Sequence, residues 1–231
     1  MNYKTELHCH CNTVSACAQE EPEALAEQYI EGGYSTIVLT DHLSRFTYLQ
    51  STLGDISDID WQKKIDYFLS GYERVCRAAK GKLNVILGVE LRLNTTESDY
   101  LIYGVDEAFL RAHPDMMDMR LREISALVRE AGGLFGQAHP FRNYITVSDP
   151  ELLDGIEVCN LNARHDSRND IAALWAEKFS LIPTSGGDYH RRGDIENGGG
   201  IITDVEIKSG EQLVGVLRSG NYKIICPAGE R

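Results

Sequence analysis

The distribution of apolar residues along the chain constrains its fold more than any other feature. Short apolar runs rich in β-branched residues alternate with longer amphipathic stretches over most of the 231 residues. The clearest short runs lie at 35–40, 84–91 and 100–105, and their nearly continuous apolar character is typical of strands covered on both faces. The weaker strand candidates are 3–8, 134–138, 155–159, 181–185, 200–203 and 222–225.

Helical periodicity fills the segments between these runs. In 60–80 the apolar residues recur at three- and four-residue steps and form one stripe. The stretch 119–131 has the same pattern and is followed by two glycines. Three further helices are predicted to start near Glu21-Pro22 and to cover 168–179 and 210–219. Because strands and helices alternate throughout, the sequence predicts an α/β fold with parallel strands, either barrel or open sheet, in one domain over 1–231.

Composition narrows the class of function and the compartment. The chain has 23 basic and 35 acidic residues, a formal charge of -12, which argues against a general nucleic-acid-binding protein. An anionic substrate stays compatible with this charge if bound metal cations, which the count omits, make an acidic pocket locally positive. No apolar stretch reaches 18 residues and no signal peptide is recognisable, so we expect no membrane span and a cytoplasmic protein.

Six cysteines are present, and in a cytoplasmic protein we expect free thiols or metal ligands rather than disulfides. Three of them, Cys9, Cys11 and Cys17, crowd one segment, but their spacing does not match a structural zinc site. Cys9 and Cys11 alternate with histidines and are expected to be buried thiols that point away from them.

Histidines and acidic residues gather where the predicted strands end. In chain order they are His8 and His10, Asp41 and His42, Glu90, His139, and Asp188 and His190. The carboxyl ends of parallel strands lie on one face of a β/α fold, so these side chains are predicted to converge there. Imidazole and carboxylate together form a ligand set for zinc, manganese or iron. Each residue alone is equally explained by a structural hydrogen bond or a helix cap, but five strand ends make coincidence a poor explanation. His113 and His165 lack such a pattern and are expected to be structural.

Five short motifs in fixed order carry a family resemblance. They are His8-Cys9-His10, Thr40-Asp41-His42, Gly88-Val89-Glu90, Ala138-His139-Pro140 and Gly187-Asp188-Tyr189-His190. This series resembles the polymerase and histidinol phosphatase (PHP) family over residues 5 to about 203. The resemblance implies a distorted (β/α)7 TIM-like barrel with two or three divalent ions (Zn, Mn or Fe) at its C-terminal face.

The resemblance also implies a ligand for each ion. The first ion takes His8, His10, Glu90 and Asp188; Glu90 bridges to a second ion shared with His139; His42 and His190 serve a third. Two positions depart from the family pattern. Ala16 stands where the family has an acidic residue or a histidine of the third site. Asp99 stands where the family often has a histidine, and its carboxylate is a candidate ligand of the second ion.

Clustered metal ions with open positions suit hydrolysis of a phosphate ester, because one ion activates water while the ions together hold the phosphoryl oxygens. The sequence hypothesis is a phosphoesterase acting on a small-molecule phosphomonoester through metal-activated water at a di- or trinuclear site. Its catalytic residues would be Asp188, His190 and His42. Arginine suits phosphate recognition. The substrate-binding candidates, near the motif histidines or at a strand end, are Arg142, Arg191, Arg192, Arg45 and Asn160.

Two other functions stay open at this point. An amidohydrolase-like enzyme that cleaves carbon–nitrogen bonds would share the His-x-His start, although no lysine lies at the strand ends singled out above. A catalytically inactive metal-binding module that regulates a partner is compatible with the change at Ala16. The motifs do not choose among histidinol phosphate, nucleotides and phosphotyrosine as substrate, and they do not give the oligomeric state.

Overall fold

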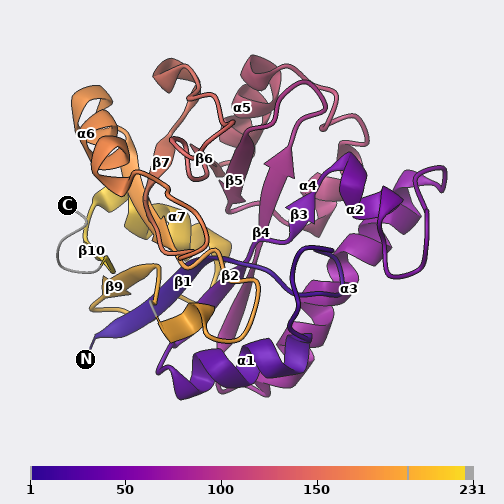
Figure 1. The fold of residues 1–231 in the computed structure, drawn as a ribbon, viewed down its shortest axis with the longest axis horizontal. Coiled ribbons are helices and arrows are strands. Elements are labelled where there is room, and N and C mark those ends of the chain that lie inside the picture. Colours follow the sequence, from indigo (N-terminus) through magenta and orange to yellow (C-terminus); the bar gives the residue numbers. More distant parts are fainter. Residues whose placement is uncertain (1, 197, 227–231) are drawn as a thin grey trace.

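The computed structural model describes residues 2–196 and 198–226, and within them ten strands form one mixed sheet wrapped by helices (Figure 1). The order across the sheet is β10-β9-β1-β2-β4-β5-β6-β7-β8, and the short strand β3 pairs with β4. The strands are β1 (Tyr3–Cys9), β2 (Thr36–Leu39), β3 (His42–Leu43), β4 (Asn84–Arg92), β5 (Asp99–Tyr103), β6 (Leu134–Gln137), β7 (Gly155–Asn160), β8 (Ile182–Gly186), β9 (Ile201–Thr203) and β10 (Lys223–Ile224).

The sheet curls until β8, at one edge, lies close to β1 and to β10 at the other edge. The end of β1 approaches the segment after β8, where Cys9 and Tyr189 form a parallel bridge and the backbone N–H of His10 donates to the Tyr189 carbonyl at 3.0 Å. Side chains of β1, β2, β4 and β5 fill the interior. The result is an α/β fold with a nearly closed, barrel-like sheet, as the sequence predicted.

Helices cover the outside of this barrel, and α1 and α3 lie side by side against it (Figure 1). Their bounds are α1 (Pro22–Glu31), α2 (Arg45–Leu49), α3 (Trp61–Ala79), α4 (Glu107–Ala112), α5 (Leu121–Glu130), α6 (Asn169–Phe179) and α7 (Gly210–Ser219). The N-cap of α3 is Asp60, whose carboxylate accepts the N–H of Gln62 at 2.9 Å. The stripe predicted for this helix is buried at Ile65, Phe68 and Val75. The five predicted helices are confirmed, whereas α2 and α4 are too short to show a periodicity.

The expectation of parallel strands is wrong for part of the sheet. β4 and β5 pair antiparallel, as do β5 and β6, and β9 runs antiparallel to β1. The segment 93–98 between β4 and β5 is the physical reason, because a parallel crossover needs a dozen or more residues. The strand positions are right, but the middle of the barrel is an antiparallel meander.

The expectation that the cysteines form no disulfide is also wrong. Cys159 at the end of β7 is joined to Cys226, which follows β10. This bond ties the last described segment of the chain to the barrel. The prediction that Cys9 and Cys11 are buried thiols is confirmed, because both are fully buried in the core beneath α1.

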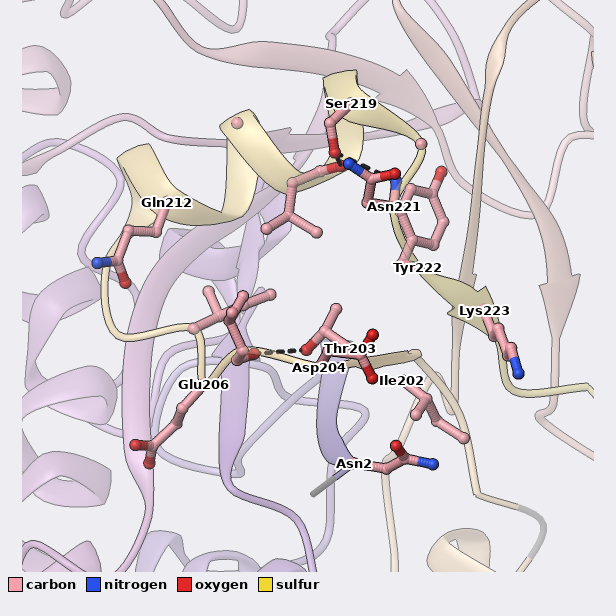
Figure 2. Close-up of a pocket in the computed structure, with 15 residues that line it drawn as sticks. Asn2, Ile202, Thr203, Asp204, Glu206, Gln212, Ser219, Asn221, Tyr222 and Lys223 are labelled. Atoms are coloured by element: carbon pink, nitrogen blue, oxygen red, sulfur yellow. Dashed lines mark hydrogen bonds between the residues drawn. The ribbon is translucent and has the colours of Figure 1, made fainter.

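A cavity of about 880 Å³ lies beside β9 and α7 near the start of β1 (Figure 2). Its lining includes Asp204, Glu206 and Lys223 but neither histidine nor cysteine. It therefore offers no imidazole or thiol ligand for a metal ion. None of the described helices has the length and apolar character needed to cross a membrane.

Candidate metal centre

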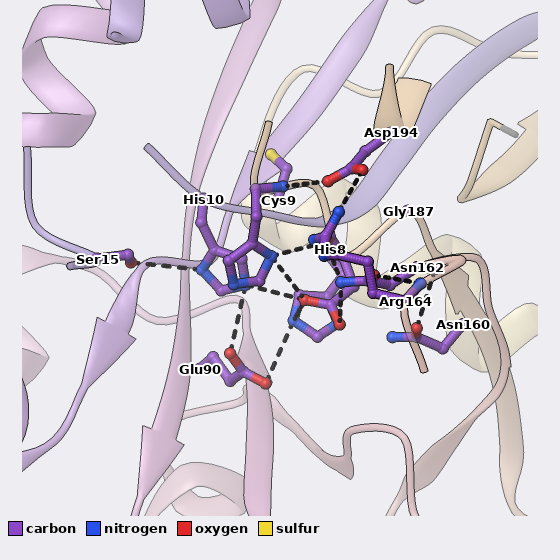
Figure 3. A network of polar contacts seen from close by, with 12 residues as sticks. His8, Cys9, His10, Ser15, Glu90, Asn160, Asn162, Arg164, Gly187 and Asp194 are labelled. Carbon is purple, nitrogen blue, oxygen red and sulfur yellow. Dashed lines mark hydrogen bonds and ion pairs between the residues drawn. The ribbon is translucent and has the colours of Figure 1, made fainter. Parts of the chain in front are cut away.

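The predicted histidines and carboxylates meet at one end of the barrel, and Figure 3 shows three of them, His8, His10 and Glu90, close together. Two of them belong to the first strand segment: His8 lies in β1 and His10 follows it. The others lie on or directly after β3, β4, β6 and β8; they are His42, Glu90, His139, Asp188 and His190. All seven are at least two-thirds buried, and only His42 and His190 have appreciable exposure. The structure thus brings together the predicted residues except Asp41, whose carboxylate accepts from Ser15 and from the backbone N–H of Cys11.

Glu90 lies at the centre of this cluster. Its Oε1 is 3.3 Å from Nε2 of His8 and 3.1 Å from Nε2 of His139. Its Oε2 is 3.3 Å from Nε2 of His10 and 2.8 Å from Nδ1 of His42. Each carboxylate oxygen therefore faces two imidazoles, an arrangement that allows one carboxylate to bridge two ions.

Asp188 faces the first pair of histidines from the opposite strand. Its Oδ1 lies 3.5 Å from Nε2 of His8 and 3.5 Å from Nε2 of His10. These two nitrogens are fully buried and have no hydrogen-bond partner among the described residues. An unpaired buried nitrogen is costly unless a cation or a donor meets it, so the donor set fits a metal ion.

Four groups of three residues could each hold a metal ion. Within a group, one ligand atom from each residue lies within 4.8 Å of the others, and some residues belong to two groups. The groups are His8, His10 and Asp188; His8, Glu90 and His139; His42, Glu90 and Asp99; and His10, His42 and His190. Asp99 is buried next to this cluster, and its Oδ2 lies 3.9 Å from Nε2 of His139. Its two oxygens accept a bidentate ion pair from Arg92, at 2.6 Å each. This ion pair fixes the Asp99 carboxylate at the edge of the cluster.

A second set of buried side chains orients the histidines. The Nδ1–H of His8 donates to Oε1 of Glu157 at 2.9 Å, which leaves the Nε2 lone pair directed into the cluster. Ser15 lies 3.5 Å from Nδ1 of His10 and donates to Asp41 at 2.7 Å. Sequence reasoning missed Glu157. The available sign was an acidic residue in an otherwise apolar strand, Gly-Ile-Glu-Val-Cys.

Charge inside the cluster is balanced between carboxylates and imidazoles. Burial alone raises the pKa of Glu90, but attraction to His42 and His8 outweighs it and brings the pKa well below the usual range. Burial likewise opposes ionisation of Asp188, yet the neighbouring His8 and His190 hold its pKa well below its usual value. Burial and repulsion by His42 and His190 lower the pKa of His10. The two carboxylates and His10 thus favour the protonation states that metal binding requires. Despite burial, Glu157 raises the pKa of His8 and Glu90 raises that of His42, so a bound ion would displace a proton from each.

Two of the candidate ligands have left-handed backbone conformations. The φ angle is +28° at His139 and +47° at Asp188. Neither residue is glycine, so both conformations are strained. Close packing also restricts Gly186, two residues before Asp188, because a Cβ atom there would lie 2.3 Å from Cβ of His8. The end of β8 therefore has no space for a side chain beside His8.

A cavity of about 400 Å³ opens above the cluster, with arginines at its rim. Arg142 donates from Nη2 to Asp188 at 2.7 Å and to Oδ1 of Asn160 at 2.8 Å. Arg191 lines the same cavity and is exposed. Asn160 is buried behind Arg142 and also donates to Glu157 at 2.9 Å, so it supports the arginine and does not line the cavity.

The structure does not bring the other two predicted arginines to this cavity. Arg45 begins α2 and its guanidinium lies over the ring of Phe46, 4.7 Å from the centroid. Arg192 is exposed, and its backbone N–H donates to Glu20 at 3.1 Å. The lining residues that sequence reasoning missed include Arg92, Arg164 and His165. His165 was expected to be structural, but it lies on the loop after β7 and lines the cavity. His113 lies elsewhere, with Nδ1 2.6 Å from the Phe109 carbonyl.

Solved structures of the same fold include predicted and putative metal-dependent phosphoesterases. A two-domain protein from Bacteroides vulgatus, containing a predicted PHP-like metal-dependent phosphoesterase, matches with a TM-score of 0.66 at 15% identity over 97% of this chain. A putative metal-dependent phosphoesterase from Bifidobacterium adolescentis gives 0.54 at 17% identity, covering 83% of this chain and 89% of its own. The lesion-specific endonuclease PfuEndoQ from Pyrococcus furiosus gives 0.67 at 15% identity over 97% of this chain.

The chain spans 64% of the length of the Bacteroides protein and 58% of that of PfuEndoQ. At these identities the likeness concerns the fold. No curated protein matches the chain. The sequence model of the PHP domain matches residues 6–189, a segment that holds every candidate ligand except His190. The chain therefore belongs to the PHP domain family.

Proposed function

We propose that this protein is a metal-dependent phosphoesterase that removes phosphate from a small-molecule phosphomonoester. One observation carries the proposal: a single cavity has imidazoles and carboxylates at its floor and guanidinium groups at its rim. The floor suits divalent cations, and the rim suits a phosphoryl group. Membership in the PHP family supports the same chemistry.

We assign the metal ligands from the donor geometry and from the family motifs. They are His8, His10, His42, Glu90, Asp99, His139, Asp188 and His190. Divalent ions bound here would supply Lewis acidity toward phosphoryl oxygens and a lowered pKa of water. The number of ions is two or three, and the mixed nitrogen and oxygen donors suit zinc, manganese or iron.

The chain's own side chains would bind and orient the substrate. Asp188 faces His8 and His10 through Oδ1 and accepts from Arg142 through Oδ2. This carboxylate therefore aligns the metal ligands with a guanidinium that can bind phosphate. His42 and His190 form the more exposed wall of the cluster, next to the space that a substrate would occupy. We assign Asp188, His42 and His190 as the catalytic residues, and Arg142 and Arg191 as phosphate-binding residues.

The size and charge of the molecule favour a small substrate over a polynucleotide. The cavity holds about 400 Å³, within the range of small-molecule sites. A formal charge of -12 opposes the approach of a polyanion, apart from the local field of the metal ions. PfuEndoQ shares the fold and is an endonuclease, so a nucleic-acid substrate belongs in the test.

The test combines metal content with product release. Protein purified without chelator is assayed for metal per chain, then for phosphate release from phosphorylated sugars, amino acids and nucleotides. Single-stranded DNA and a set of amides are assayed in parallel. We expect two or three ions and turnover of phosphomonoesters, with Asp188→Asn reducing kcat/KM by at least about 100-fold, the scale of one essential polar group at a reacting centre.

A matched variant controls for the amide substitution. Asp204→Asn makes the same chemical change at an exposed residue away from the cluster and is expected to leave activity unchanged. Turnover of amides alone would show a carbon–nitrogen hydrolase. Metal binding without turnover of any substrate would favour the regulatory module.

A further inference from the structure

A thiol lies on the wall of the cavity beside the third group of histidines. Cys17 lines the cavity together with His42 and His190. Its side chain interacts with both imidazoles. It is a free cysteine and exposed to the solvent that fills the cavity. Sulfur is therefore available next to two candidate ligands of the proposed metal centre.

The loop that carries Cys17 is fixed to the histidine segments on both sides. After the cysteine, the backbone N–H of Gln19 donates to the carbonyl of His190 at 2.7 Å. Before it, the hydroxyl of Ser15 accepts the backbone N–H of His42 at 3.0 Å. The position of the thiol relative to these two imidazoles is thus set by the backbone and not by a free loop.

Three imidazoles in this part of the cluster form a donor group without a carboxylate. The ring of His10 lies 4.5 Å from the ring of His42 and 4.5 Å from that of His190, measured between centroids. One nitrogen from each lies within 4.8 Å of the others. Nε2 of His10 faces Glu90 and Asp188, which assigns His10 to the first ion and leaves His42 and His190 for the third.

The orientation of His190 leaves a second nitrogen available. Its Nδ1–H donates to the carbonyl of Asp188 at 2.8 Å. The proton is therefore on Nδ1, and the lone pair of Nε2, on the other side of the ring, is available to a metal ion. Two neutral imidazoles, those of His42 and His190, provide no negative charge to offset a divalent cation. A thiolate as the third protein donor would supply that charge and leave the fourth position open.

We propose that Sγ of Cys17 is a metal ligand and joins His42 and His190 at the third ion, while His10 stays with the first. The inference rests on the proposed metal centre and assigns a role to a residue outside the motifs. On binding, the thiol proton leaves to solvent as the sulfur–metal bond forms, and no oxidation state changes. Sulfur favours zinc or cobalt over manganese, whereas the groups that contain Glu90 and Asp188 also suit harder ions.

Cobalt provides a direct test that does not depend on activity. Metal-free protein is loaded with Co²⁺ while absorption is recorded, because a thiolate–cobalt bond gives a charge-transfer band in the near ultraviolet that nitrogen and oxygen ligands do not give. We expect the band in the wild type, its loss in Cys17→Ser, and a loss of one bound equivalent per chain in that variant. Cys76→Ser removes another free thiol, on α3 and outside the cavity, and should keep both.

Thiol modification provides a second readout. Iodoacetamide should label Cys17 in the metal-free protein and label it at least about ten times more slowly after loading with Zn²⁺. Labelling of Cys76, identified by peptide mass spectrometry in the same samples, should not change with zinc. Melting curves of the metal-free variants verify that Cys17→Ser folds as the wild type does.

The outcomes separate this inference from the proposed function. A wild-type protein that hydrolyses phosphomonoesters but gives no charge-transfer band overturns the cysteine ligand alone. Persistence of the band and of full metal content in Cys17→Ser does the same. A protein that binds no cobalt and releases no phosphate overturns both proposals.

Discussion

Glu157 and His8 form a fully buried pair, in which Nδ1–H of the imidazole donates to Oε1 of the carboxylate at 2.9 Å. The other carboxylate oxygen accepts the backbone N–H of His139, also at 2.9 Å. One side chain on β7 thus fixes candidate ligands from β1 and from the end of β6. In the metal-free protein, this contact gives His8 a single tautomer and a single ring orientation.

Glu157→Gln should weaken metal binding without removing a proposed ligand. An amide has a single acceptor oxygen, so it cannot accept from His8 and His139 together. Loss of such a supporting partner typically costs 10- to 100-fold in metal affinity, and we expect a decrease within this range. Competition with a coloured chelator measures the affinity.

Glu177→Gln provides the control for this change. Glu177 is exposed on α6, so the same substitution there should leave metal affinity within about twofold of the wild type. Equal affinities for Glu157→Gln and the wild type would show that the carboxylate does not position the ligands.

Arg142 and Arg45 provide a test of which guanidinium binds the phosphate. Arg142→Ala should lower kcat/KM about 10- to 100-fold, because it removes charge-assisted hydrogen bonds worth about 1.5–3 kcal/mol. Arg45→Ala should have little effect, since Arg45 lies over Phe46 and outside the cavity. Steady-state kinetics on one phosphomonoester suffices. A larger loss of kcat/KM in Arg45→Ala than in Arg142→Ala would indicate that the substrate binds outside this cavity, on the side of Arg45.

Alkaline pH should destabilise the protein through Tyr222. Burial raises the pKa of this phenol to about 12, from 10 in an unfolded chain, and its hydroxyl donates to the Pro183 carbonyl at 2.7 Å. The unfolded chain therefore releases its proton first, so stability present below pH 10 is lost as the pH rises toward 12. For a ring this exposed we expect a decrease of about 1 kcal/mol in the free energy of unfolding.

Urea unfolding of the wild type and Tyr222→Phe at pH 8 and pH 11 measures this contribution. The variant lacks the titrating hydroxyl, so the stability difference between the two proteins should shrink as the pH rises. Other tyrosines titrate in both proteins and cancel in the comparison. A difference that stays constant with pH would show that this phenol titrates alike in both states.

The Cys159–Cys226 disulfide should contribute to stability under oxidising conditions. Cys226→Ser is expected to lower the free energy of unfolding by about 2–4 kcal/mol, the usual effect of a bond that closes a long loop. Cys76→Ser, which changes a free cysteine, serves as the control. Thiol titration in denaturant should find four free thiols before reduction and six afterwards. Six thiols without reductant would show that the bond does not form.

The candidate site could be predicted from the sequence because its residues occupy strand ends. His8, Glu90 and Asp188 are far apart in the chain, yet the carboxyl ends of the strands place them together. Arg142 was predicted for a similar reason, its distance of three residues from a motif histidine. Arg45 has the same spacing from His42, but α2 begins there and directs its side chain elsewhere.

Other features depend on tertiary structure that local patterns do not contain. The antiparallel pairing of β4 and β5 could have been inferred from the short connection between them, but the pairing of β5 with β6 could not, since helices intervene. Cys159 and Cys226 lie 67 residues apart, and no spacing rule gives the connectivity of six cysteines. Arg92 and Arg164 reach the cavity from a strand end and a loop whose paths the sequence does not specify.

The left-handed backbone at Asp188 implies that this position opposes folding while it serves the site. A glycine would adopt φ of +47° without strain, whereas any other side chain keeps the cost of about 1 kcal/mol or more. Replacement by glycine would relieve this backbone strain but would also remove the buried carboxylate that accepts from Arg142 and faces His8 and His10. The fold therefore keeps a strained backbone at a residue that links a guanidinium group to two histidines.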